Sequence, residues 1–412
     1  MKLSIDQNRL TRELDELAAI SEFPAPAVTR VVFTEADLSG RVFVKHLCRD
    51  AGLEIREDAV GNMFARWVGR EPHLPAVGTG SHIDAIPNAG KFDGTVGVLG
   101  GLEAIRALKQ ASLHPRRSIE LLMFTSEEPT RFGVGCLGSR LLAGTLDHSA
   151  GHRLKDKDGT SLDEARARAG FVGPLQEVRL HPGHYHAFVE LHIEQGPILE
   201  QKQIGLGIVA AIAAPASLRL WIEGEGGHAG AVLMPQRHDA FLAAAEIALA
   251  VESAARATGA EDTVGTTGVC DVFPGAINSI PSRVRLEVDI RDIDRERRDQ
   301  VLKQIESAIH DVSTRRGLTV RTEVLNADPP AQCDPSVIAA LTRACVAEGA
   351  SFEKMISRAY HDSLFMSFIA PTAMLFIPCR GGVSHRPDEY SSPESVAQGA
   401  LILGRALADL AA

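Results

Sequence analysis

The sequence has no apolar run close to the roughly 20 residues that a membrane-spanning helix needs, and its first residues, Met1–Asp6, show no apolar signal-peptide core. The six cysteines include no Cys-x-x-Cys pair, which argues against a zinc knuckle or a disulfide framework. Basic residues are not in excess: 43 Lys and Arg face 53 Asp and Glu, giving a net charge of -10. We therefore expect a cytoplasmic protein with neither nucleic acid nor membranes among its partners.

The length and the order of predicted elements indicate two domains. A chain of 412 residues with 45% hydrophobic content is globular and too long for one core. Beyond residue 212 the pattern changes to strand–helix–strand–strand–helix–strand, and it changes back near Pro329 and Pro330. We expect a main α/β domain built from residues 1–212 and 329–412, interrupted over residues 213–328 by an α+β domain of the split-βαβ, or ferredoxin-like, kind.

Hydrophobic periodicity predicts the elements that position the polar motifs. In the second helix, over residues 35–51, Val42, Phe43 and Leu47 are able to share one face. The apolar runs over 118–125 and 372–378 are typical of strands buried on both sides. Further helices are predicted over 6–20, 237–258, 295–316, 335–348 and 392–410, and further strands within 53–67 and over 187–196, 214–223, 265–269, 282–291, 318–325 and 353–358.

Four polar loops or strand ends carry residues suited to chemistry. They are the glycine-rich stretch 78–94 with His82, Asp84 and Asp93, the pair Glu127 and Glu128, the strand end at His192, and the turn at His385 with His361 nearby. Three of these follow predicted strands, and ligand groups in open α/β sheets collect beyond the carboxyl ends of strands. We therefore expect the four to meet in one site.

These residue types favour a centre of two divalent metal ions. Imidazole and carboxylate suit such ions, and paired ions lie roughly 3.5–4 Å apart and share one carboxylate. Because adjacent side chains diverge, we assign Glu128 as a ligand and Glu127 as the general base. Asp84 is expected to orient the imidazole of His82. Each motif alone also has a structural interpretation, as a core histidine or a solvated pair of glutamates, and the joint pattern favours the metal centre.

A second cluster of histidines lies in the polar tract that ends near residue 186. It contains His148, His152, His181, His184 and His186. A metal site is one interpretation and solvated loop histidines are the other. We favour the second, because no carboxylate or strand frames these side chains.

Five motifs resemble the amidase/carbamoylase branch of the di-metal aminoacylase and exopeptidase superfamily, over nearly the whole chain. They are His82-x-Asp84, the run 91–94, the run 125–132 with Ser126-Glu127-Glu128-Pro129, the run 190–197, and Gly382-Val383-Ser384-His385. The resemblance implies a homodimer, a catalytic domain interrupted by a lid and dimerisation domain, and two divalent ions, with Mn²⁺ preferred and Zn²⁺ as the alternative. It implies Glu127 as the catalytic residue and, as metal ligands, His82, bridging Asp93, Glu128, His192 and His385.

The resemblance also implies residues that bind the substrate. His228, in Gly227-His228-Ala229-Gly230, resembles a histidine that reaches the partner subunit's active site. Asn278 and Arg291 resemble lid residues that hold the substrate carboxylate, for which Arg is a natural bidentate partner. From the residues alone, Arg291 reads as a surface ion-pair residue and Asn278 as a turn residue. The rest of the expected set is Gln195, Tyr360, His361 and Gly382.

Members of this branch hydrolyse N-carbamoyl amino acids, β-ureidopropionate, allantoate or ureidoglycolate. Carbamoylases and allantoate amidohydrolases typically carry Gly-Ala-Gly-His-Asp-Ala where this chain has the different run Ser357–Ser363. The tracts 124–144 and 354–392 are instead similar to ureidoglycolate amidohydrolases. Tyr360 suits that substrate, because a phenol can hydrogen-bond its 2-hydroxyl; a core tyrosine is the structural alternative.

The expected activity is hydrolysis of a small ureido acid, (S)-ureidoglycolate, to glyoxylate, ammonia and carbon dioxide. The alternatives are an N-carbamoyl-L-amino acid hydrolase or an allantoate amidohydrolase. A dipeptidase is disfavoured by the branch-specific residues His192 and Gln195. A non-catalytic binding protein that retains the fold is disfavoured because the ligand set and the base are complete.

Overall fold

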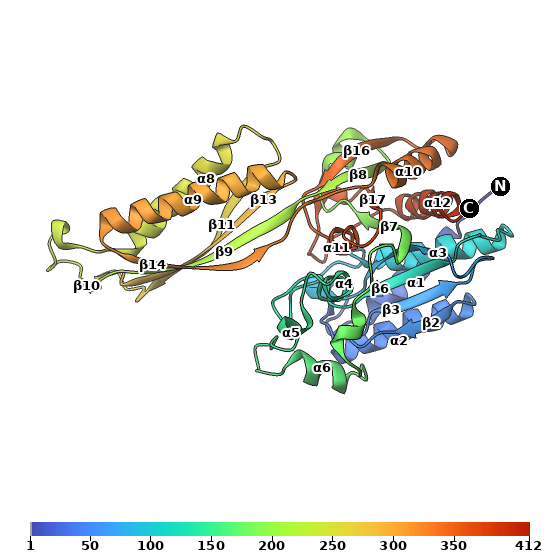
Figure 1. Ribbon diagram of the computed structural model, residues 1–412, viewed down its shortest axis with the longest axis horizontal. Coiled ribbons are helices and arrows are strands. Elements are labelled where there is room, and N and C mark those ends of the chain that lie inside the picture. The colour runs from blue at the N-terminus through green and yellow to red at the C-terminus, as the bar shows by residue number, and fades with distance from the viewer. Residues whose placement is uncertain (1) are drawn as a thin grey trace. The chain divides into compact units, whose positions relative to one another are not determined.

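The computed structural model describes residues 2–412 and shows two compact units (Figure 1). The first unit contains the chain up to Ala210 together with Cys333–Ser357 and His361–Ala412. The second contains Ala211–Gln332 and the short stretch Arg358–Tyr360. The chain therefore leaves the first unit once for a long excursion and again for three residues.

A nine-stranded sheet forms the centre of the first unit. The strand order is β15 (Ala331–Gln332), β8 (Leu206–Ile212), β17 (Thr372–Ile377), β7 (Tyr185–Ile193), β4 (Ala76–His82), β6 (Ile119–Phe124), β3 (Met63–Trp67) and β2 (Glu54–Glu57), and β16 (Phe352–Ser357) pairs with β8. The four central strands, β17, β7, β4 and β6, run parallel. Parallel strands buried on both faces are apolar along their length, and β6 and β17 were the clearest strands in the sequence for this reason. The carboxyl ends of the four strands meet at one edge.

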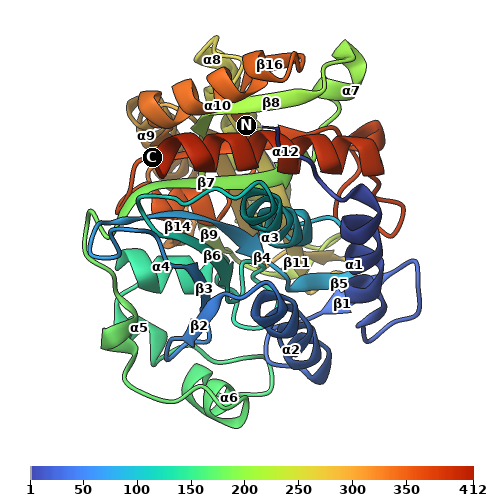
Figure 2. The ribbon, with the colours of Figure 1, turned by 90° about the vertical axis from the view of Figure 1, so that its right-hand side faces the viewer.

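Helices cover this sheet. On one side, α3 (Thr95–Gln110) contacts β4 and β7, α12 (Pro393–Leu410) contacts β7 and β17, and α1 (Gln7–Ala19) packs on both helices (Figure 2). On the other side, α11 (Asp362–Met366) packs on β7 and β17 and contacts α4 (Leu137–Ala143) (Figure 1). The edge that carries His82 therefore lies between two helical layers.

Helix α2 (Glu35–Asp50) buries a face other than the one that its apolar residues can share. Of the three apolar residues on that shared face, Val42 is 61% exposed and the other two are half-buried. Arg41 is buried instead, because its guanidinium donates to Asp37 Oδ2 at 2.9 Å and to the hydroxyl of Thr125 at 3.2 Å. A charged side chain can thus be buried at this helix face in place of an apolar one, because it is paired and hydrogen-bonded.

The remaining elements of the first unit are short connections and one further helix. The short strands β1 (Val28–Arg30) and β5 (Ala85–Ala89) pair antiparallel, and α10 (Pro335–Ala347) begins with a proline in its first turn. The others are α5 (His148–Gly151), α6 (Leu162–Arg168), α7 (Ile198–Lys202) and the 3₁₀ turns η1 (Leu175–Val178) and η3 (Arg380–Gly382).

The second unit is a four-stranded antiparallel sheet with two helices on one face. Its strand order is β11 (Val264–Phe273), β13 (Arg283–Asp292), β9 (Ala214–Glu223) and β14 (Thr319–Ala327), and α8 (Ala240–Ala257) and α9 (Arg295–Arg316) pack on it and on each other (Figure 1). Two short strands, β10 (Gly227–His228) and β12 (Ser279–Ile280), pair with each other, and η2 (Met234–Gln236) is a 3₁₀ turn. Alternate residues of β13 are buried against the helices, as in a sheet covered on one face.

This βαββαβ order is the one that the sequence predicts for the second unit, and the predicted mixed α/β class is confirmed.

Among residues 2–412, the structure contains no helix with both the length and the apolar character for a membrane span.

Candidate metal centre

His82 is the last residue of β4 and lies beside Phe124, the last residue of β6. His192 lies one residue before the end of the neighbouring parallel strand β7. These ends share the carboxyl edge of the sheet, where open α/β folds collect ligand groups. Glu127 and Glu128 follow β6 at the same edge.

The carboxylate of Asp93 lies at the middle of the site. Its Oδ1 is 3.2 Å from Nε2 of His192 and 3.5 Å from Nε2 of His82. Its Oδ2 is 3.1 Å from Nε2 of His385. Burial tends to raise the pKa of Asp93, but the hydrogen bonds with the three imidazoles outweigh it and hold that pKa well below the ordinary value. One carboxylate thus presents its two oxygens to two separate sets of side chains.

Main-chain carbonyls fix the imidazoles of two histidines. Nδ1–H of His82 donates to the carbonyl of Asp84 at 3.0 Å, and Nδ1–H of His192 donates to the carbonyl of Ile193 at 2.9 Å. Nε2 of each ring is therefore the nitrogen turned toward Asp93, and it is the one that would bind a metal ion. The expected role of Asp84 changes in detail, because its carboxylate Oδ1 lies 3.6 Å from Nδ1 of His82 while its carbonyl makes the contact.

Gly94 closes the turn after Asp93 at a position where only glycine fits. Its φ is +65°, and a Cβ there would lie 2.5 Å from the ring of His82. Its N–H donates to Nε2 of His192 at 3.2 Å. The backbone of this turn is thus packed directly against two candidate ligands.

The adjacent glutamates point to different sides of the site. Oε1 of Glu128 lies 3.4 Å from Nε2 of His385, and Oε2 of Glu127 lies 3.8 Å from Nε2 of His82. The carboxylate of Asp84 accepts the main-chain N–H groups of Glu127 at 3.2 Å and Glu128 at 3.0 Å, which holds the loop. Burial raises the pKa of Glu127 well above its ordinary value and that of Glu128 to about 7. Carboxylates this crowded and desolvated suit a site completed by cations.

Two groups of ligands meet the distance requirements of a metal site. Each has three ligand atoms within 4.8 Å of one another, and they share Asp93: His82 with Asp93 and His192, and Asp93 with Glu128 and His385. These five residues are the ligands expected from the sequence. The donor set, the Nε2 atoms turned toward Asp93 and the two-sided carboxylate all fit a pair of divalent ions bridged by Asp93.

A third group, Glu190 with His192 and His361, is better explained by hydrogen bonding. The carboxylate of Glu190 accepts the hydroxyls of Ser81 at 2.7 Å and Ser363 at 2.6 Å. The ring of His361 lies 4.4 Å from that of His192, and burial and then the charge of His192 hold the pKa of His361 well below its ordinary value. His361 is thus a neutral ring against the back of a candidate ligand.

Two more expected residues of the first unit border the site. Nε2 of Gln195 donates to Oδ2 of Asp93 at 2.8 Å and to the hydroxyl of Ser384 at 3.2 Å. Gly382 has φ +67°, and a Cβ there would lie 2.6 Å from the main-chain nitrogen of Pro197. Gly382 therefore lets the turn before His385 pack on the turn after Gln195.

The other expected substrate residues, His228, Asn278, Arg291 and Tyr360, belong to the second unit. His228 is exposed and accepts the N–H of Gly230 at Nδ1. Arg291 pairs with Asp289 at 2.8 Å and donates to the carbonyl of Arg358 at 3.3 Å. Within the second unit it therefore forms an ion pair, as its residue type alone predicts. Asn278 is exposed, and Tyr360 is half-buried.

The loop histidines form no metal group among the described residues. His152 is paired with Asp163 at 2.5 Å, and the ring of His184 packs edge-on against Tyr185. The interpretation of this tract as ordinary loop structure is the one that the contacts favour.

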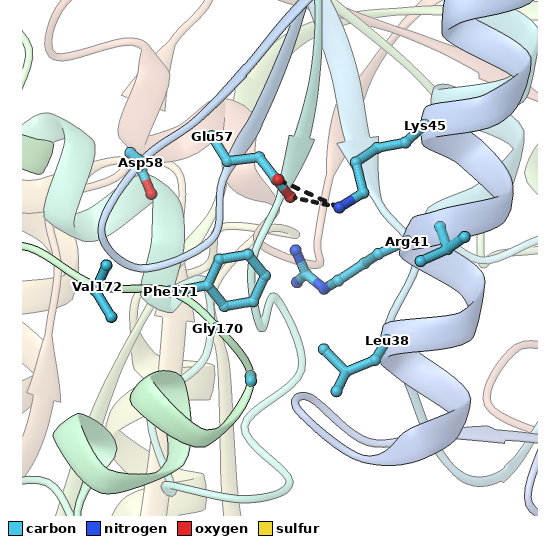
Figure 3. A pocket seen from close by; sticks show the side chains of 10 residues that line it. Leu38, Arg41, Lys45, Glu57, Asp58, Gly170, Phe171 and Val172 are labelled. Atoms are coloured by element: carbon cyan, nitrogen blue, oxygen red, sulfur yellow. Dashed lines mark hydrogen bonds and ion pairs between the residues drawn. The ribbon is translucent and has the colours of Figure 1, made fainter.

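A pocket of about 430 Å³ lies elsewhere in the first unit, between α2 and the loop that carries Phe171 (Figure 3). Lys45 and Glu57 form an ion pair at its rim, and the guanidinium of Arg41 lies 5.5 Å from the centre of the Phe171 ring. None of the expected site residues lines it. Arg41, which lines this pocket, donates a hydrogen bond to Thr125, the residue after β6 on the way to Glu127 and Glu128.

Sequence reasoning missed Glu389 and Ser384. Ser384 stands next to His385 in a quoted motif, and its hydroxyl lies 3.2 Å from Oδ2 of Asp93. Glu389 accepts main-chain N–H groups of the Asp93 loop. An acidic residue four positions after a metal-type histidine was the available signal, but its partners lie 297 and 296 residues away in the sequence.

Residues 78–409 match the peptidase family M20/M25/M40. The chain belongs to this family. The family is metal-dependent, which agrees with the candidate ligand groups. The relatives of the chain are hydrolases, and the chain is therefore a hydrolase as well.

Relatives and solved structures cover almost the whole chain. A ureidoglycolate hydrolase of Arabidopsis thaliana is 52% identical over 415 residues, spanning 99% of this chain and 87% of that protein. An N-carbamoyl-L-amino acid amidohydrolase of Geobacillus stearothermophilus is 40% identical over 400 residues, 97% of each. A crystal structure of AtUAH in complex with glyoxylate has a TM-score of 0.89 and 52% identity, covering 99% of this chain and 98% of that one.

Proposed function

We propose that this chain hydrolyses (S)-ureidoglycolate to glyoxylate, ammonia and carbon dioxide. The observation that carries this proposal is the likeness to a ureidoglycolate hydrolase at 52% identity over 99% of the chain, against 40% for the N-carbamoyl-L-amino acid amidohydrolase. The solved structure of AtUAH with glyoxylate has the same fold at the same identity. The departure of Ser357–Ser363 from the carbamoylase pattern supports the same substrate.

The reaction would use two divalent ions, for which we propose Mn²⁺, with Zn²⁺ as the alternative. His82, His192 and Oδ1 of Asp93 would hold one ion, and Oδ2 of Asp93, Glu128 and His385 the other. Ions bound there supply Lewis acidity toward a carbonyl oxygen and lower the pKa of water.

Glu127 is proposed to move the proton. Its carboxylate belongs to neither of the two groups that share Asp93, and its Oε1 accepts a weak hydrogen bond from the thiol of Cys136 at 3.4 Å. A buried carboxylate with a raised pKa takes a proton from water readily and returns it to the leaving nitrogen. Asp84 serves this step by holding the main chain of Glu127.

The expected substrate residues are proposed to bind the ureido acid. We propose that Asn278 and Arg291 bind its carboxylate and that Tyr360 donates to its 2-hydroxyl, with His361, Gln195 and Gly382 shaping the site near the ligands. His228 of the partner subunit would complete the site. To bind a substrate carboxylate, the half-buried side chain of Arg291 would exchange its present partner Asp289 for that group.

A homodimer is proposed through the second unit. Strand β11 lies at one end of its sheet, so one row of its main-chain groups is unpaired. Val264 and Phe273, at the ends of that strand, are 41% and 53% exposed, and Leu249 on the adjacent helix α8 is 67% exposed. A second copy pairing along β11 would cover this surface, and light scattering of the purified chain tests its mass.

Ammonia release from ureidoglycolate, allantoate and N-carbamoyl amino acids, with and without Mn²⁺, tests the activity. We expect ureidoglycolate to have the highest kcat/KM and chelation to abolish turnover. Higher kcat/KM for an N-carbamoyl amino acid would assign the rival activity. No hydrolysis of any ureido acid by the Mn²⁺-loaded protein would favour a binding protein that retains the fold.

Tyr360→Phe tests the basis of substrate choice, with Tyr390→Phe as the matched control. Losing one hydrogen bond to the 2-hydroxyl should lower kcat/KM for ureidoglycolate roughly tenfold, or about 1.4 kcal/mol. N-carbamoylglycine lacks that hydroxyl, so its kcat/KM should not change. An equal effect on both substrates would assign Tyr360 to the core instead.

A further inference from the structure

Glu389 is buried between the loop that carries Asp93 and the turn that carries His385, with 4% of its surface exposed. Its Oε1 accepts the main-chain N–H groups of Phe92 at 2.9 Å and Asp93 at 3.1 Å. Its Oε2 accepts the hydroxyl of Ser384 at 2.9 Å. A single carboxylate thus contacts two of the three segments that supply the group Asp93, Glu128 and His385.

The Asp93 loop depends on this carboxylate for its hydrogen bonds. Helix α3 begins after Gly94, whose position carries no side-chain cap. The N–H of Gly94 donates to His192, and the two N–H groups before it donate to Glu389. Buried N–H groups without an acceptor are costly, so the conformation that aims Asp93 is stable only while Glu389 is in place.

The His385 turn depends on the same side chain through Ser384. The hydroxyl of Ser384 lies between Glu389 and Oδ2 of Asp93, at 2.9 Å and 3.2 Å. His385 itself has φ +57°, a conformation that a non-glycine residue keeps only when its surroundings hold it. Fixing the preceding residue is one way to hold it.

The backbone of the Asp93 loop also packs on Glu389. A Cβ at Gly90 would lie 2.4 Å from Cβ of Glu389 and 2.5 Å from its Oε1. Glycine at this position lets the chain pass over the carboxylate at contact distance. The contact is therefore built from both sides, by a small residue and by three hydrogen bonds.

We propose that Glu389 is a positioning residue that presets Asp93 against His385 and thereby sets the affinity for the ion held by Asp93, Glu128 and His385. The inference rests on the proposed metal centre. Groups that hydrogen-bond behind metal ligands typically change metal affinity by 10–100-fold. Glu389 differs from the usual case because it acts on the main chain of one ligand and on the neighbour of another.

Calorimetric titration of Mn²⁺ into the metal-free full chain tests this, together with thermal unfolding of the metal-free protein. Glu389→Ala should lower the affinity for one of the two Mn²⁺ ions by about 10–100-fold. The far-ultraviolet circular dichroism should stay unchanged. Glu389→Gln, whose amide oxygen can still accept a main-chain N–H, should restore part of the affinity. Asp388→Ala is the control, because Asp388 is exposed and pairs with Arg386 on the surface.

Ser384→Ala keeps the test decisive if Glu389→Ala does not fold. It removes the donor to Oε2 and leaves both main-chain bonds to Oε1, so Mn²⁺ affinity should fall by less than in Glu389→Ala but beyond the control. Wild-type affinity in Glu389→Gln and Ser384→Ala together would overturn the proposal. Failure of the wild-type protein to bind either Mn²⁺ or Zn²⁺ would instead overturn the metal centre itself, and with it the proposal.

Discussion

Oδ1 of Asp93 lies 3.2 Å from Nε2 of His192, while Oδ2 of the same carboxylate lies 3.1 Å from Nε2 of His385. In the proposed centre, this carboxylate would bind both metal ions. Removing one of its charges should therefore affect both ions, whereas removing one histidine should affect one.

Asp93→Asn should reduce bound Mn²⁺ from two ions per chain to less than one, because the amide offers one neutral oxygen in place of two charged ones. His192→Ala and His385→Ala should each keep about one ion. Elemental analysis after gel filtration measures the content, with Asp388→Asn as the control. Retention of two ions by Asp93→Asn would mean that Asp93 does not bridge.

The two glutamates should separate binding from catalysis. Glu127→Gln should keep its Mn²⁺ but lower kcat by roughly 10²–10⁴-fold, the usual contribution of a general base. Glu128→Gln should bind one of the two ions more weakly. Its kcat at saturating Mn²⁺ should change less than its affinity for the metal. Metal content and initial rates on the same preparations distinguish them, and loss of metal from Glu127→Gln would reverse the assignment.

Gly94→Ala should damage the centre beyond its backbone cost. Alanine at φ +65° is strained, and its Cβ would also overlap the ring of His82. Gly349→Ala is a matched control, because φ is +63° there and nothing lies within 4 Å of the added Cβ. Both should lose about 1–2 kcal/mol of unfolding free energy from the φ strain, but only Gly94→Ala should weaken Mn²⁺ binding at least several-fold. Equal Mn²⁺ affinities would contradict this.

Much of the site could be predicted because its ligands follow strands. Glu128 follows the strongly apolar strand β6, and His192 lies near the end of β7, whose pattern also predicts a strand. The last part of β4, which carries His82, was instead expected to be a glycine-rich turn. The meeting of those ends at one edge follows from the rules of parallel sheets. The order of helices and strands in the second unit could be predicted equally well, because helical and strand periodicities alternate there without interruption.

The parts that could not be predicted depend on partners far away in the sequence. Arg41 took the buried face of α2 because acceptors from other segments, such as Thr125, receive its guanidinium. The only local signal for Glu389 was its position four residues after His385, and that position does not reveal its acceptor role, which needs the distant Asp93 loop. The main-chain carbonyl of Asp84 orients His82 in place of the expected carboxylate. Every residue type has such a carbonyl, so the sequence gives no signal for this role.

The second unit should lose a specific contribution to its stability in acid. Hydrogen bonds from Arg315 and then Arg316 lower the pKa of Glu246 from 4.5 to about 2. A lowered carboxyl pKa stabilises the fold above pH 4.5, and the contribution disappears as the pH falls toward 2. Glu246→Gln should therefore cost about 0.5–1 kcal/mol at pH 7 and less at pH 3. Urea unfolding followed by Trp221 fluorescence in a Trp67→Phe background measures it. Glu252→Gln, on the same helix with one exposed partner, should cost less at pH 7; an equal cost would count against the Glu246 network.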